Sequence, residues 1–183
     1  MRCKGLGMES LGSFTTRAGK QINFRYVQKD DAALLVDLFN HLSFEAKRLR
    51  FHLYTDKLPK ERIWKEAMAL SNLNPALQVA IIATTIDADG QEHAVGVVRF
   101  ARATSNDTEA EVAVVVRDDI QRNGLARRLL GILAEKARQM GITHFTGWVL
   151  AENVRLMKLI EKLKLPVESE IRYGQRKIRI PLT

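Results

Sequence analysis

Cysteine is almost absent from this sequence, in which Cys3 is the single thiol among 183 residues. One thiol cannot form an internal disulfide bond, so we predict a protein of a reducing compartment, the cytoplasm. No apolar run approaches the roughly 20 residues that a membrane-spanning helix needs, so no membrane partner is expected. Residues 1–19 lack the apolar stretch of a secretory signal and are expected to form a flexible leader.

Metal-ligand patterns are also missing. The four histidines show no ligand spacing, and Cys3 stands alone, so we predict no metal site. No arrangement of serine, histidine and aspartate indicates a hydrolase triad either.

A clustered basic segment is absent, although 29 basic residues stand against 21 acidic ones and give a net charge of +8. Such an excess is the first indication of a nucleic-acid partner. Here, however, the basic residues are spread along the chain and alternate with acidic ones. Because no zinc-finger spacing, RNA-binding aromatic motif or long basic helix occurs, we predict no specific nucleic-acid binding.

Hydrophobic periodicity predicts alternating strands and helices. Strands are expected over 20–28, 76–85, 94–101, 110–116 and 144–150. Helices are expected after an N-cap at Asp30 or Asp31, over 43–54, from Pro59 with Ile63, Trp64, Ala67 and Leu70 as its apolar stripe, over 125–140 and after Asn153. This order predicts an α/β fold, with a mixed, mostly antiparallel sheet, one parallel strand pair and helices on both faces. We expect residues 20–183 to form a single domain. Its oligomeric state is left open between monomer and homodimer.

The stretch from Ala110 to Ala126 carries the clearest chemical information. A β-branched run, Val112 to Val116, ends in a polar turn, and the pattern of an amphipathic helix opens at Gly124. Such a turn directs unpaired backbone N–H groups and a helix dipole at one spot, which favours phosphate. Gly124 lets a phosphate approach the backbone closely, because it carries no Cβ.

Residues 121–126, Gln-Arg-Asn-Gly-Leu-Ala, resemble the Gln/Arg-x-x-Gly-x-Gly/Ala signature of the GNAT superfamily of N-acetyltransferases. The strand before it, the helix after it and a second strand over 144–150 match the same pattern. The resemblance implies the GNAT fold, with two central strands that splay apart, and acetyl-CoA as acyl donor. It assigns cofactor binding to these residues: Val114, Val115, Val116, Gln121, Arg122, Asn123, Gly124, Leu125, Ala126, Arg127 and Asn153. For Asn153, a plain helix N-cap is an equally compatible role.

Glu111 resembles the catalytic glutamate that lysine acetyltransferases of this superfamily carry on the same strand. A lysine amine has a pKa of about 10.4, so freeing it at pH 7 costs roughly 4–5 kcal/mol, and a general base offsets part of that cost. The apolar residues flanking Glu111 predict a desolvated and therefore more basic carboxylate. The alternative is a solvated carboxylate at a strand edge.

Two departures from the superfamily pattern bear on function. Ile160 stands where many members carry a tyrosine as general acid, and Lys164-Leu165 replaces the usual Gly-Phe. The missing tyrosine favours the protein-lysine branch, and residues 43–51 resemble an element of bacterial protein acetyltransferase (Pat-like) domains. We therefore predict an acetyl-CoA-dependent N-acetyltransferase whose acceptor amine is a protein lysine. The alternative is a non-catalytic module of the same fold that binds CoA as a sensor.

Overall fold

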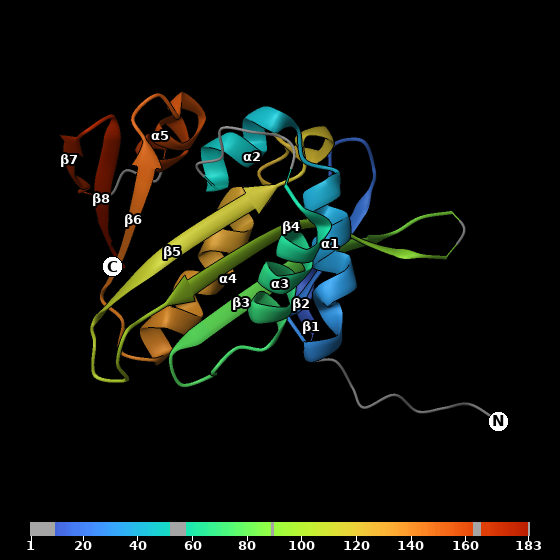
Figure 1. The fold of residues 1–183 in the computed structure, drawn as a ribbon, viewed down its shortest axis with the longest axis horizontal. Coiled ribbons are helices and arrows are strands. Elements are labelled where there is room, and N and C mark those ends of the chain that lie inside the picture. The colour runs from blue at the N-terminus through green and yellow to red at the C-terminus, as the bar shows by residue number, and fades with distance from the viewer. Residues whose placement is uncertain (1–9, 52–57, 89, 163–165, 183) are drawn as a thin grey trace.

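The computed structural model describes residues 10–51, 58–88, 90–162 and 166–182, which build one eight-stranded sheet flanked by helices (Figure 1). The strands are β1 (Ser10–Thr15), β2 (Gln21–Tyr26), β3 (Gln78–Ile86), β4 (Glu92–Ala101), β5 (Glu109–Val116), β6 (His144–Leu150), β7 (Glu168–Arg172) and β8 (Gln175–Pro181). The α-helices are α1 (Ala32–Asn40), α2 (Phe44–Phe51), α3 (Lys60–Ser71), α4 (Leu125–Gln139) and α5 (Val154–Glu161). Two 3₁₀ turns, η1 (Lys29–Asp31) and η2 (Asp118–Ile120), precede α1 and α4.

The strands follow the order β1-β2-β3-β4-β5-β6-β8-β7. All neighbours run antiparallel except β5 and β6, which are parallel and are joined through α4. The predicted α/β class, with a mixed, mostly antiparallel sheet and one parallel pair, is confirmed. Within the described residues, no helix is long and apolar enough to cross a bilayer.

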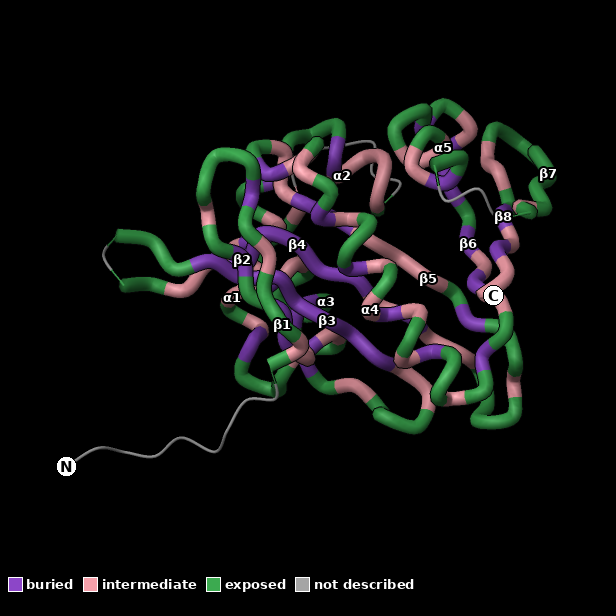
Figure 2. The backbone as a smooth tube through the Cα atoms, turned by 180° about the vertical axis from the view of Figure 1, so that it is seen from behind, coloured by how far each residue is buried: buried purple, intermediate pink, exposed green. Residues whose placement is uncertain are grey.

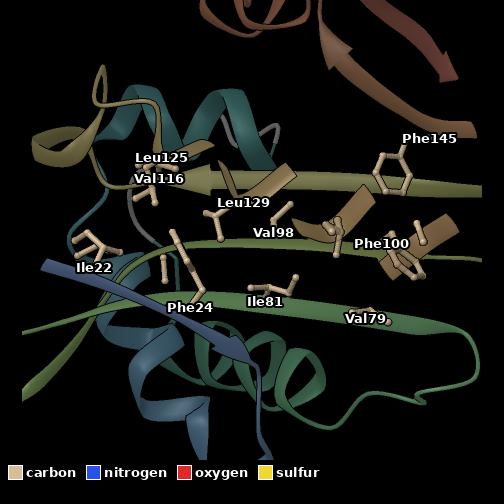
Figure 3. Close-up of a cluster of buried hydrophobic side chains, with 14 of the residues drawn as sticks. Ile22, Phe24, Val79, Ile81, Val98, Phe100, Val116, Leu125, Leu129 and Phe145 are labelled. Atoms are coloured by element: carbon tan, nitrogen blue, oxygen red, sulfur yellow. The ribbon is translucent and has the colours of Figure 1, made fainter. Parts of the chain in front are cut away.

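Side chains of β5 alternate between two cores, because successive residues of a strand point to opposite faces. Ala110 and Val116 belong to a large cluster that packs against α4, and side chains of β2, β3 and β4 complete it (Figure 3). Val115 belongs to a second cluster, which packs against α1 and α3 on the opposite face. The buried central strands therefore lie between two helical layers, as Figure 2 shows from behind. The expectation of helices on both faces is confirmed.

Helix α4 has the periodicity that the sequence predicts. Leu125, Leu129, Leu133 and Ala137 recur every four residues and are buried. Gly141, with a φ of +77°, directly follows the last helical turn, where a left-handed residue lets the backbone leave the helix. The helix that begins at the candidate phosphate turn is thus anchored along its length.

The flexible leader expected over residues 1–19 is wrong for residues 10–15. They form β1, which pairs antiparallel with β2, and Leu11 and Phe14 pack against the larger core. The pairing is irregular between Ser10 and Ser13, so the apolar residues stand three apart instead of alternating. Periodicity therefore gave no indication of a strand. Residues 1–9, with Cys3, lie outside the described residues.

Two local predictions near the second core are corrected. Trp64 was expected on the buried stripe of α3 but is 43% exposed, because Ala67 and Leu70 define the inward face and Trp64 lies to one side of it. Asp31 occupies the N-cap position of α1, yet its carboxylate makes no capping hydrogen bond there. Instead it accepts two hydrogen bonds from the buried Arg25 guanidinium, at 2.6 and 2.9 Å.

The β7–β8 hairpin was not predicted. All five residues of β7 are exposed, and the strand has neither an alternating nor a continuous apolar pattern. The hairpin extends the sheet beyond β6 through the pairing of β6 with β8.

Candidate active site

The two parallel central strands pair at one end only. Glu109, Ala110 and Glu111 of β5 are paired with residues 144–146 of β6, and the pairing stops there. Beyond this point β5 continues to Val116 and β6 to Leu150, and the two strands diverge (Figure 1). An extended chain with amide groups can pair with the backbone edges left open by such a splay. The splayed pair that the resemblance implies is therefore present, with Glu111 in the last paired position.

The turn between β5 and α4 presents a series of unbonded backbone N–H groups. Arg122 and Gly124 both have left-handed backbones, with φ of +64° and +86°. Among the described residues, no acceptor is recorded for the backbone N–H groups of residues 122–127. Left-handed residues in a turn, followed by a helix N-terminus, form an anion-binding geometry. This geometry fits the diphosphate of a CoA molecule.

Side chains of the same turn stabilise it through hydrogen bonds. The Gln121 amide donates to the Val116 carbonyl at 3.0 Å, and the Asn123 amide donates to the Ile120 carbonyl at 3.1 Å. Asn123 also accepts a hydrogen bond from the backbone N–H of Arg17, in the β1–β2 turn, at 3.3 Å. These contacts engage the side chains of Gln121 and Asn123, while the backbone N–H groups of the turn have no recorded acceptor among the described residues.

Glu111 lies on the face of the sheet that carries α1, α2 and α3. It stands opposite Ala101 in the register, and the side chains of β5 on this face are Glu111, Ala113 and Val115. Glu111 is exposed, and among the described residues it makes no hydrogen bond or ion pair. The desolvation expected from its apolar neighbours is therefore not found, because Ala110 and Val112 point to the opposite face.

Asn153 caps α5, since its side-chain oxygen accepts a hydrogen bond from the Leu156 backbone N–H at 3.1 Å. The N-cap role is thus confirmed, and its contact with a cofactor stays a prediction. Ile160, at the position of the superfamily's tyrosine, is 4% exposed and packs in a small core with Val149 and Ile178. Lys164 and Leu165 lie outside the described residues.

Helix α2 lies close to the splay, and ion pairs connect it to α5 and to the turn between β6 and α5. Arg48 pairs with Glu152, between β6 and α5, and Glu45 pairs with Arg155 of α5 at 3.6 Å. Arg155 also donates to the Gln121 side chain at 3.5 Å. These contacts hold α2 beside both β6 and the phosphate turn.

Two arginines that the sequence did not assign to the site share the face of Glu111. Arg99 of β4 stands opposite Ala113, two residues along β5 from Glu111 and on the same face, and Arg50 belongs to the last turn of α2. Burial lowers the pKa of Arg50 to about 10; the like charge of Arg99 adds to the decrease and Glu111 opposes it. Periodicity could not have found this group, because it joins three separate elements.

A scan against protein-family models places residues 40–164 in the Acetyltransferase (GNAT) family. The chain belongs to this family. The splayed strands, the phosphate turn and Glu111 all lie within the matched residues. Members of this family are acetyltransferases, and acetyl-CoA is the acyl donor that the family uses.

Relatives and solved structures agree with this family. Acetyltransferase Pat of Mycolicibacterium smegmatis is 38% identical over 65 residues, which are 36% of this chain and 20% of that protein. The chain thus spans only a fraction of the length of this curated relative. The GNAT domain of S. lividans PAT is 25% identical with a TM-score of 0.78, covering 93% of this chain and 96% of that one.

A further structure, of yncA, a putative acetyltransferase from Salmonella typhimurium with its cofactor acetyl-CoA, shares the fold. It is 18% identical to this chain with a TM-score of 0.61, and it covers 88% of this chain and 94% of that one. The similarity to bacterial Pat-like domains that the sequence indicates is therefore confirmed.

Proposed function

We propose that this GNAT chain transfers the acetyl group of acetyl-CoA to the side-chain amine of a protein lysine. The observation that carries the proposal is Glu111, an unpaired carboxylate in the last paired position before the splay. The names of the Pat relatives and the lack of a proton donor at Ile160 support the protein-lysine branch. This proposal also includes a cytoplasmic location, no nucleic-acid partner and a single domain to which β1 belongs.

Different residues around the splay would bind different parts of acetyl-CoA. Backbone N–H groups of residues 122–127 would hold the diphosphate, and the open edge of β5 over Val114–Val116 would pair with the pantetheine arm. Arg127, exposed in the first turn of α4, would add positive charge beside the phosphates. When bound, acetyl-CoA supplies an activated acyl group. All these residues belong to β5, the turn after it and the first turn of α4, so one continuous segment positions the donor.

Glu111 would accept the proton of the incoming ammonium, directly or through water. Its exposure leaves it accessible to a protein side chain that arrives from the face of α2. Removal of that proton is the costly step at neutral pH, and a positioned base typically contributes roughly 10²- to 10⁴-fold in rate. Ile160 cannot protonate the departing thiolate, so the thiolate must leave unassisted or be protonated by water.

A screen of acceptors tests the proposal. The protein is incubated with acetyl-CoA and separate panels of lysine peptides and proteins, polyamines and small amines. Thiol release is followed, and acetylated products are identified by mass spectrometry. We expect turnover with lysine side chains to exceed turnover with the other panels. Preferential acetylation of polyamines or small amines would contradict the lysine acceptor while leaving the acetyltransferase activity standing.

A further inference from the structure

Two arginines on the face of Glu111, Arg50 and Arg99, have no acidic partner within the part of the chain that the structure describes. Among the described residues, neither Arg50 nor Arg99 lies within 4.0 Å of a carboxylate, and neither guanidinium donates a recorded hydrogen bond. Both are partly buried. Guanidinium groups that are partly removed from water are usually paired, because an unpaired charge loses solvation without compensation.

Neighbouring carboxylates are already engaged elsewhere. Glu45 and Glu152 are paired with Arg155 and Arg48, and Glu109 is paired with Arg179 at 2.8 Å. Among the described residues, Glu111 is the carboxylate whose negative charge acts on Arg50, without a hydrogen bond or ion pair between them. Two arginines and one glutamate leave this part of the site with one positive charge in excess.

The Arg50 guanidinium rests on an aromatic ring, and Arg99 projects from a central strand. Arg50 lies over the Phe51 ring, with its Cζ 4.9 Å from the ring centroid, and Phe51 packs against Phe39 at 5.4 Å. Arg99 extends from a central strand on the face of the sheet that also carries Glu111 and Ala113. Guanidinium groups match the geometry of a carboxylate, because each offers a planar fork of donors.

We propose that Arg50 and Arg99 form a carboxylate-binding subsite of the acceptor site, so that the preferred acceptor lysine is flanked by an aspartate or glutamate. This inference rests on the proposed lysine acceptor. The flanking carboxylate neutralises the excess positive charge, and the lysine amine is thereby directed to Glu111. Without the carboxylate, an ammonium group meets two unpaired cations and one anion, which disfavours its binding.

The test uses peptide pairs that contain one lysine and differ only in whether a position from −2 to +2 holds glutamate or glutamine. We expect at least one glutamate peptide to exceed its glutamine partner roughly tenfold or more in kcat/KM, chiefly through KM, since charge-assisted hydrogen bonds are strong. Calorimetric titration of the same peptides with the CoA-bound protein should show the same preference without any reaction. In R50Q and R99Q the preference should disappear, with acetyl-CoA affinity unchanged.

R62Q, on the exposed surface of α3, is the matched control and should keep the preference. Equal rates for all glutamate and glutamine pairs, or an equal preference in R50Q and R99Q, would overturn the subsite while the lysine acceptor stands. If no lysine peptide is acetylated while small amines are acetylated rapidly, the proposed function is refuted, and the subsite is refuted with it.

Discussion

Substitution of Gly124 tests the phosphate turn, because the structure separates its effect on binding from its effect on stability. Gly124 has a φ of +86°, and a Cβ built on it meets no atom within 4 Å. A side chain there therefore costs about 1–2 kcal/mol of backbone strain, but it makes no clash within the protein. Against a typical stability of about 5–15 kcal/mol, the Gly124→Val variant should remain folded. The added side chain would occupy open space at the turn where the diphosphate is proposed to bind, so acetyl-CoA binding should be abolished.

Gly141 provides a matched control at the other end of α4. It has a φ of +77° and likewise no atom within 4 Å of a built Cβ. Gly141→Val should therefore lose a similar amount of stability in urea denaturation, while acetyl-CoA titrates with native affinity in calorimetry. Near-native affinity in a folded Gly124→Val protein would refute the proposed diphosphate site. Equal losses of acetyl-CoA affinity in both variants would show that backbone strain, rather than the position of the new side chain at the phosphate turn, determines binding.

Three further outcomes are expected. Arg25→Ala leaves the buried Asp31 carboxylate unpaired and should destabilise the protein by about 3–5 kcal/mol in urea denaturation, whereas a loss under 1 kcal/mol would contradict a buried pair. Asn153→Ala should cost about 1 kcal/mol of stability through the lost cap, and Asn153→Asp should restore most of it, which thermal unfolding of both variants measures. Nucleic acid should associate only weakly and dissociate at moderate salt in filter-binding titrations, and tight binding at physiological salt would reverse this expectation.

Local sequence patterns predict the segment that holds the donor site. The β-branched run of β5, the glycine at 124 and the repeat of leucines in α4 are all contiguous, and their geometry depends mainly on neighbours in the chain. The parallel pair and the turn into α4 therefore agree with the prediction, and the splay agrees with what the family resemblance implies. The exposed Glu111 matches the alternative of a solvated carboxylate, because alternation places its apolar neighbours on the other face of the sheet.

Features that depend on contacts between distant parts of the chain were not predicted, because local sequence patterns do not encode such contacts. Arg99 neighbours Glu111 through the pairing of β4 with β5, Arg50 comes near it when α2 packs over β5, and no spacing along the chain encodes either arrangement. Asp31 seemed a helix cap because local preference favours aspartate there, yet a buried guanidinium from β2 competes for its carboxylate. Strands β1 and β7 lack an alternating apolar pattern, so only their pairing in the sheet reveals them.

The central claim is that Glu111 takes the proton of the acceptor amine, and a pH–rate profile of Glu111→Gln tests it most directly. With a competent lysine peptide, turnover at pH 7 should fall by roughly 10²-fold or more while acetyl-CoA affinity stays unchanged. The deficit should shrink as pH rises toward the amine pKa of about 10.4, because solution then supplies the free amine. Glu109→Gln is the matched control on the same strand and face, and it should stay within a few-fold of the parent. Parallel profiles of Glu111→Gln and parent, separated by less than a few-fold, would contradict the claim.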